Sequence, residues 1–130
     1  MILKIKGIVK SGMGNASFWV KKINKIFEKK YGMKLFAGTL NVELEKPYIL
    51  NSKDKILPSE YGGKYEVLVE NVLLFENEAY ILRPEINNAE GGDHSLNIIE
   101  IVSDINLRER YDLKDGDEIS IIWKNTCKEQ

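Results

Sequence analysis

The amino-acid sequence predicts a small, mainly β protein, a closed six-stranded β-barrel with two short packed helices. Several segments of five to ten residues alternate apolar and polar side chains, and their connections suit antiparallel pairing. Long loops interrupt these segments, and closure of the sheet would remove exposed strand edges. The chain of 130 residues has the length of one domain, residues 1–130, and can bury a core without disulfides.

Six segments are predicted as strands from their alternation and their content of β-branched and aromatic residues. In chain order they are Ile2–Val9, Leu35–Leu44, Tyr65–Phe75, Ala79–Leu82, Leu96–Val102 and Glu118–Trp123. Residues 76–78 are predicted as the turn between the third and fourth strands. The second strand has the cleanest pattern in the first half, with Leu40, Val42 and Leu44 on one face and Thr39, Asn41 and Glu43 on the other.

Two helices are predicted between these strands. Residues 20–31 place their apolar positions on one stripe, with Gly32 as a stop signal and the lysines on a solvated opposite face. Residues 106–111 form a short helix opened by Asn106, with Glu109 three residues later. Residues 10–17, 47–64 and 84–95 are predicted as loops, and the second is either a flap over a site or an insertion.

Composition limits the function classes. Apolar residues make up 43% and charged residues 30%, with 19 Lys and Arg against 20 Asp and Glu, which excludes a disordered chain and gives no reason to expect a nucleic-acid partner. The single cysteine, Cys127, cannot form an internal disulfide, so a reducing cytoplasm is the natural compartment. No apolar run is long enough to span a membrane, and the N-terminus does not resemble a signal peptide, so a cytoplasmic protein is expected.

Familiar enzyme motifs are missing from the sequence. It has neither a Gly-x-x-x-x-Gly-Lys-Ser/Thr loop nor a His-Glu-x-x-His helix. The single histidine, His94, is interpreted as an incidental surface residue, and Cys127 lacks the surroundings of a reactive thiolate.

Three features still suggest chemistry. Ser11-Gly12-Met13-Gly14 directly follows a strand, where backbone N–H groups could cradle an anion, although most such turns are only turns. Thr39 and Asn41 offer two neutral oxygens that suit Mg²⁺ when phosphates supply its other ligands, although such pairs are more often ordinary surface residues. Glu100 interrupts an apolar run, and is either at a solvent face or placed to accept a proton or a hydroxyl hydrogen bond.

Short motifs follow one another in a specific order along nearly the whole chain. They are Gly7 and Val9, Ser11-Gly12-x-Gly14, Gly38-Thr39-Leu40-Asn41-Val42-x-Leu44, His94-Ser95, Ile98-Ile99-Glu100-Ile101, Leu107-Arg108-Glu109 and Leu113-Lys114-Asp115-Gly116-Asp117. In this order they resemble the archaeal CTP-dependent riboflavin kinase family. The joint occurrence of the motifs at 38–41 and 107–117 is the most specific part of the resemblance.

The resemblance implies a cradle-loop β-barrel that transfers the γ-phosphate of CTP to the 5′-hydroxyl of riboflavin, giving FMN and CDP. Thr39 and Asn41 would bind the cofactor Mg²⁺, and Glu100 would meet the flavin, together with Gly92, and accept the hydroxyl proton. Two segments would bind the nucleotide: Gly12, Met13, Gly14, Asn15, Ala16 and Ser17, and Ile105, Asn106, Leu107 and Arg108. The expected protein is a monomer with no membrane or nucleic-acid partner.

Two loops depart from the family pattern. Ala16 and Ser17 stand where the family usually has a glycine and a basic residue, and residues 90–93 replace lysines and a threonine. Less positive charge near a triphosphate weakens its stabilisation, unless Arg83, Lys10 or Lys21 compensates. A non-catalytic flavin- or nucleotide-binding barrel is therefore the alternative, and a nucleic-acid-binding barrel that uses the lysines between 21 and 34 is a weaker one.

Overall fold

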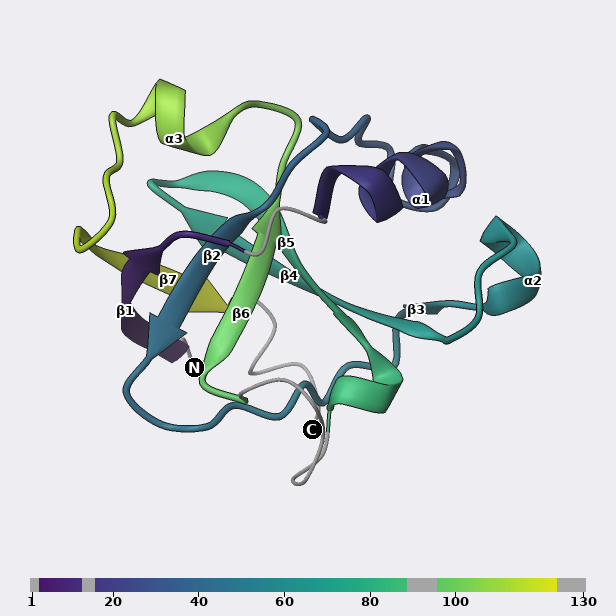
Figure 1. Ribbon diagram of the computed structural model, residues 1–130, viewed down its shortest axis with the longest axis horizontal. Helices are drawn as coiled ribbons and strands as arrows, with labels where there is room; N and C mark the ends of the chain where they lie inside the picture. The colour runs from purple at the N-terminus through teal and green to yellow at the C-terminus, as the bar shows by residue number, and fades with distance from the viewer. Residues whose placement is uncertain (1–2, 13–15, 89–95, 124–130) are drawn as a thin grey trace.

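A computed structural model describes residues 3–12, 16–88 and 96–123, and it confirms the predicted fold class. The strands are β1 (Leu3–Lys10), β2 (Leu40–Leu44), β3 (Lys55–Ile56), β4 (Val67–Leu74), β5 (Asn77–Pro84), β6 (Ile98–Val102) and β7 (Glu118–Trp123). They lie in the order β3-β4-β5-β6-β2-β1-β7, and a pairing of β4 with β7 closes six of them into a barrel, with β3 outside it. All pairings among the described strands are antiparallel (Figure 1).

The helices lie outside this barrel (Figure 1). They are α1 (Ala16–Tyr31), α2 (Pro58–Tyr61), α3 (Leu107–Arg110) and a 3-10 turn, η1 (Glu85–Asn87). Both predicted helices are present, and α1 ends as predicted before Gly32, whose φ is +77° and whose N–H donates to the Glu28 carbonyl at 2.8 Å.

Alternation along the strands builds two apolar clusters, one on each side of the sheet. The interior of the barrel holds Val9, Val42, Ile99 and Ile101 together with their buried neighbours. The outer cluster joins Val20, Ile23 and Phe27 of α1 to Val67, Val69, Tyr80, Leu82 and Val102. Phe27 meets Tyr80 edge-on, with 5.0 Å between the ring centroids. Helix α1 therefore covers the outer face of β4, β5 and β6 at these positions. The other described outward side chains of the sheet are not part of this cluster.

The second strand is shorter than predicted. It begins at Leu40 and not at Leu35, so Thr39 lies directly before β2 and not within it. Residues 35 and 36 use their backbone groups elsewhere: the Asn24 side chain donates to the Leu35 carbonyl and accepts from its N–H, and the Phe36 N–H donates to Ser103. Backbone groups of residues 35 and 36 that bond to the Asn24 side chain and to the Ser103 carbonyl are not used for pairing with a neighbouring strand.

Other boundaries also differ from the prediction. Strand β1 ends at Lys10 and not at Val9, β4 is Val67–Leu74 and not Tyr65–Phe75, β5 is Asn77–Pro84 and not Ala79–Leu82, and β6 begins at Ile98 and not at Leu96. Helix α1 begins at Ala16, so residues 16 and 17 are helical and not part of the predicted loop, in keeping with the high helix propensity of alanine. The β4–β5 turn is Phe75–Glu76, with φ of 51° and 69°, and not residues 76–78, because a two-residue loop with positive φ matches the twist of a hairpin. The predicted loop 47–64 contains β3 and α2, which begins with Pro58 at a favourable first position, and the predicted loop 84–95 contains the last residue of β5 and then η1.

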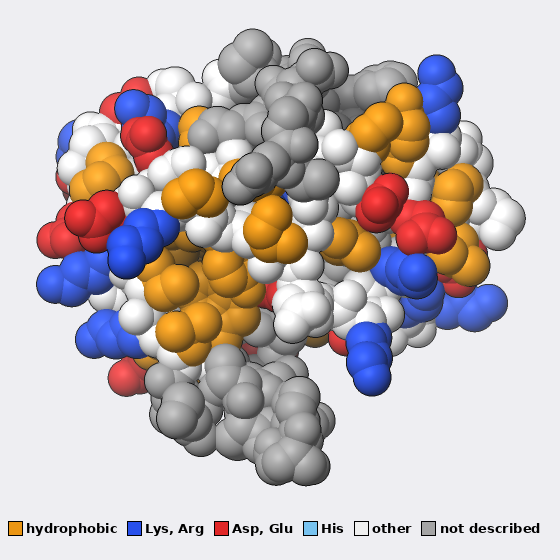
Figure 2. Space-filling view, turned by 90° about the horizontal axis from the view of Figure 1, so that it is seen from below, with side chains coloured by type: hydrophobic (Ala, Val, Ile, Leu, Met, Phe, Trp, Pro, Cys, Tyr) orange, Lys and Arg blue, Asp and Glu red, His pale blue; other side chains and the backbone are white. Residues whose placement is uncertain are grey.

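None of the described helices is long and apolar enough to span a membrane. On the face shown in Figure 2, apolar side chains lie near the centre, while acidic and basic side chains are mixed toward both sides. Acidic and basic side chains are therefore interspersed on the described part of this face.

Candidate functional site

The pairing register brings three separated polar residues into one row across β1, β2 and β6. Asn41 is the direct partner of Lys10 on one side and of Glu100 on the other. Direct partners in an antiparallel pair point to the same face of the sheet, with Cβ atoms about 4.5–5.5 Å apart. Since the residues that alternate with them, such as Val9 and Val42, fill the barrel interior, this row faces outward.

The predicted metal ligands are Asn41, the middle residue of this row, and Thr39, which lies directly before β2. The Oγ1 atom of Thr39 is buried and has no hydrogen-bond partner among the described residues. Burial of an unpaired hydroxyl is costly, so this atom fits a ligand that offers a strong electrostatic partner. The part of the chain that the structure describes contains no cluster of three or more His, Cys, Asp or Glu side chains that could hold a metal. At nucleotide sites Mg²⁺ takes few ligands from the protein and most of the rest from phosphate and water, so a pair of side chains could be sufficient here.

Gly12 brings the first loop directly onto Asn41. A Cβ atom at position 12 would overlap the Nδ2 atom of Asn41 and lie 3.2 Å from its Cγ, while Oδ1 would lie 3.6 Å away. Only glycine allows this approach without displacing the amide. Gly12, the first residue of the predicted phosphate loop, and Asn41, a predicted metal ligand, are therefore neighbours in space.

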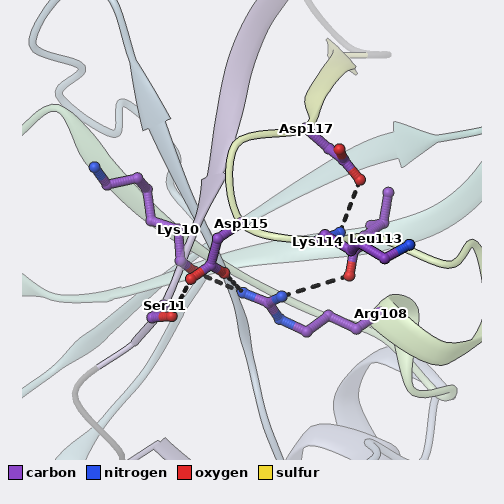
Figure 3. Close-up of polar contacts among 7 residues, drawn as sticks. All are labelled: Lys10, Ser11, Arg108, Leu113, Lys114, Asp115 and Asp117. Atoms are coloured by element: carbon purple, nitrogen blue, oxygen red, sulfur yellow. Dashed lines mark hydrogen bonds and ion pairs between the residues drawn. The ribbon is translucent and has the colours of Figure 1, made fainter.

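A polar cluster fastens the beginning of this loop to the segment that follows α3 (Figure 3). Arg108 donates to the Lys10 carbonyl at 2.9 Å and to Oδ1 of Asp115 at 2.6 Å. The Ser11 hydroxyl donates to the other carboxylate oxygen of Asp115. The Ser11 hydrogen bond, followed by the Arg108 guanidinium, holds the pKa of Asp115 below its ordinary value. Arg108, which is predicted to contact the nucleotide, thus joins the end of β1 to the segment that follows α3.

The backbone of these segments is held by further hydrogen bonds. Val9 donates to the Asp117 carbonyl at 2.8 Å, and Gly116 donates to the Val9 carbonyl at 2.8 Å. Asn106 caps α3 as predicted, since its side chain accepts from the Glu109 N–H at 3.2 Å. These bonds fix the end of β1 against the segment that follows α3.

The remaining predicted nucleotide contacts differ in what their side chains can offer. The Leu107 side chain packs in the barrel core, so a ligand could meet this residue only through its backbone. The backbone N–H of Ile105 is held by the Ser103 hydroxyl at 3.4 Å. Ala16 and Ser17 lie in the first turn of α1. Met13, Gly14, Asn15, Gly92 and His94 lie outside the described residues.

Glu100 lies within β6, on the strand that the sequence predicted for it. It alternates with the buried residues Ile99 and Ile101, and shares its face with Ile98 and Val102. Val102 packs under α1, whereas Glu100 is only partly buried beside Asn41. The carboxylate is therefore at the border between the covered and the open part of the outer sheet face.

A second polar cluster, inside the barrel, was missed by the sequence analysis. Glu70 is 8% exposed and accepts hydrogen bonds from the Tyr48 hydroxyl at 2.6 Å, the Asn51 N–H at 2.8 Å and Trp123 Nε1 at 2.8 Å. Burial, followed by the hydrogen bond to Glu70, raises the pKa of the Tyr48 hydroxyl. A signal was present, because alternation along β4 places Glu70 on the same face as Leu68 and Val72.

Arg83 belongs to this interior region and not to the outward row. It is 5% exposed, and burial lowers its pKa. Its guanidinium donates to the Tyr48 and Ile98 carbonyls and to the Asn88 side chain. Arg83 is therefore committed to carbonyl groups of the fold and does not compensate for missing charge at the outward row.

Comparisons with known proteins match this chain over most of its length. A family model described as "CTP-dep_RFKase: Domain of unknown function DUF120" matches residues 9–122. A riboflavin kinase of Staphylothermus marinus is 34% identical over 125 residues, which cover 94% of this chain and 92% of that protein. Riboflavin kinases of Saccharolobus solfataricus and Sulfurisphaera tokodaii are 33% and 34% identical over 92% of this chain, and the matches cover 73% and 94% of those proteins.

Proposed function

We propose that this chain, which belongs to the CTP-dependent riboflavin kinase family and is an enzyme, transfers the γ-phosphate of CTP to the 5′-hydroxyl of riboflavin, giving FMN and CDP. The observation that carries the proposal is the register that makes Asn41 the direct partner of Glu100. It places a candidate ligand of the metal–nucleotide complex beside a candidate proton acceptor. Phosphoryl transfer needs little covalent chemistry from a protein beyond such positioning and charge stabilisation.

Thr39 Oγ1 and Asn41 Oδ1 are the proposed protein ligands of Mg²⁺. The unpaired, buried hydroxyl of Thr39 supports this assignment, as does the packing of Gly12 against the Asn41 amide. When bound, Mg²⁺ would neutralise charge on the phosphates. The loop that begins at Ser11 and Gly12 would hold the phosphates through backbone N–H groups, which need no charged side chain.

Glu100 is the proposed proton acceptor. In the proposed reaction, the 5′-oxygen of riboflavin forms a bond to the terminal phosphorus while the bond from that phosphorus to the bridging oxygen of CDP breaks. The hydroxyl proton passes to the Glu100 carboxylate. All of these groups come from one copy of the chain, so a monomer is the proposed catalytic unit.

The proposal is tested by incubating the purified chain with riboflavin and CTP, ATP or GTP, with Mg²⁺ or with EDTA, and separating the flavins by chromatography. FMN should form with CTP and Mg²⁺, much less with the other nucleotides, and not with EDTA. Absence of FMN with every nucleotide would reject the enzymatic proposal, and saturable riboflavin or CTP binding without turnover would then identify a non-catalytic binding barrel.

Variants connect this activity to the row. Asn41→Ala and Thr39→Ala should each abolish FMN formation at limiting Mg²⁺, with partial recovery at high Mg²⁺ if the side chains bind the metal. Asn71→Ala is the matched control, because Asn71 is also a partly buried strand asparagine, bonded to the Ala79 carbonyl at 3.2 Å and remote in register from Asn41. Equal loss in the control would mean that the effect is structural.

A further inference from the structure

We propose that Lys10 is the side chain that binds the terminal phosphate of the nucleotide, and that Glu43 holds the Lys10 ammonium when no nucleotide is bound. This inference rests on the proposed function and assigns a charged partner to the same site. It follows from the placement of Lys10, the charges around it and the salt bridge that it forms.

The backbone of Lys10 is fixed beside the candidate metal ligands. Lys10 is the last residue of β1 and the direct partner of Asn41, so their side chains leave the sheet on the same face. Its carbonyl oxygen accepts from Arg108 at 2.9 Å, which anchors the backbone, while its side chain is 47% exposed. Figure 3 shows the Lys10 side chain extending away from the Arg108–Asp115 pair. The ammonium can therefore change partners without moving the strand.

Arg83 and Arg108 are engaged elsewhere, and the loop after β1 adds no cation. The sequence from Ser11 to Ser17 contains no Lys or Arg, so the loop itself offers no cationic side chain. Arg83 is buried among carbonyl groups, and the Arg108 guanidinium pairs with Asp115 at 2.6 Å. A triphosphate keeps net negative charge even with one Mg²⁺ bound. A positioned lysine ammonium commonly binds the phosphate that carries this remaining charge.

Glu43 is suited to a temporary partner. Its Oε1 atom lies 3.2 Å from the Lys10 Nζ atom, and its side chain is 45% exposed. Exposed ion pairs are weak, because water screens them and two long side chains lose freedom. A phosphate group with two charges can therefore take the ammonium from the carboxylate. Glu43 lies on the same strand and face as Asn41, so the ammonium would move along β2 toward the candidate metal ligands.

The test compares Lys10→Gln with Lys6→Gln. Lys6 is also on the exposed, outward side of β1 but pairs with Ser120 of β7, four residues from Lys10. The dissociation constant of the nucleotide with Mg²⁺ is measured by titration calorimetry for the wild-type protein and each variant. Lys10→Gln should weaken triphosphate binding roughly 10-fold, the lower range for a hydrogen bond to a charged group, and Lys6→Gln should leave it unchanged. Binding of the nucleoside monophosphate should be the same in all three proteins.

Glu43→Gln separates a ligand-binding lysine from a merely structural salt bridge. Removal of the competing carboxylate should strengthen triphosphate binding several-fold, so the two partners of one ion pair should have opposite effects. If the pair only supported the strand, both variants would weaken binding together, and this result would overturn the proposal.

Two further outcomes are also decisive. Unchanged affinity in Lys10→Gln, or a 10-fold loss in Lys21→Gln instead, would reject Lys10 as the phosphate ligand while leaving the proposed function intact. A wild-type protein that binds no nucleotide would overturn both proposals.

Discussion

Gly12→Ala should separate positioning of the metal ligand from stability of the fold. The added Cβ would lie closer than 3.0 Å to the Asn41 Nδ2 atom, and Cβ atoms in proteins essentially never make contacts this short. To restore an ordinary contact of 3.4 Å, the Asn41 amide would have to move by about 1 Å. The neighbour is the end of a side chain and not backbone, so the amide can yield without disturbing the strand. The variant should therefore fold normally with a displaced ligand.

The expected magnitude follows from this displacement. A shift of about 1 Å in a positioned group costs roughly 100-fold in catalysis, so kcat/KM for FMN formation should fall by about that factor. The free energy of unfolding should change by less than about 1 kcal/mol, because replacing glycine by alanine at a position without positive φ mainly restricts the unfolded chain. Activity is measured by chromatography of FMN and stability by denaturation in urea.

A double-mutant cycle tests whether Gly12 acts through Asn41. In an Asn41→Ala background no amide remains to be displaced, so Gly12→Ala should cause no further loss of Mg²⁺-dependent nucleotide binding, measured as the ligand-induced rise in melting temperature. Additive losses would refute the reasoning. A wild-type kcat/KM in the single variant, or a loss of stability as large as the loss of activity, would also refute it.

Three other predictions concern the fold. Glu70→Met should lower the free energy of unfolding by about 3–5 kcal/mol, because it leaves three donors inside the barrel without an acceptor. Glu66→Gln removes one partner of a solvent-accessible ion pair with Lys55 and should cost under about 1 kcal/mol in the same urea titration. Phe27→Ala should cost about 3–5 kcal/mol, because Phe27 is fully buried between α1 and the sheet; a cost below about 1 kcal/mol would contradict this packing. Burial raises the pKa of Tyr31 to about 12, so the unfolded chain releases this proton first, near the ordinary value of 10.0. Stability should therefore fall as the pH rises from about 10 to 12, and Tyr31→Phe should show a smaller decrease.

The sequence predicted the strands well where the apolar residues alternate. The last strand has the predicted bounds, and Leu40, Val42 and Leu44 all face the interior. Alternation encodes which face of a strand is buried, so it survives in the structure wherever one face meets the core. It could not exclude residues 35–39 from the second strand, because Leu35 and Phe36 meet their partners, Asn24 and Ser103, only in the tertiary fold.

The site was predictable as a set of residue types but not as a geometry. Nothing in the sequence states that Asn41 lies opposite Glu100 or that Gly12 touches Asn41, since both contacts depend on the pairing register and on the path of a loop. The sequence likewise does not reveal that Asp115 accepts hydrogen bonds from both Ser11 and Arg108. Glu70 was different, because its position on an inward face could be derived from alternation in β4 alone.

The outward row depends on the barrel core for its geometry, although it contributes little to that core. A slip of one residue between β2 and β6 would turn Asn41 inward and bring Leu40 to the outer face. Burial of Val42, Ile99 and Ile101 on the interior face opposes such a slip, because each would have to exchange with a polar neighbour. Register is therefore the link between stability and function in this chain: substitutions in the core should disturb the row by shifting its pairing, whereas substitutions in the row should change ligand binding while the barrel remains folded.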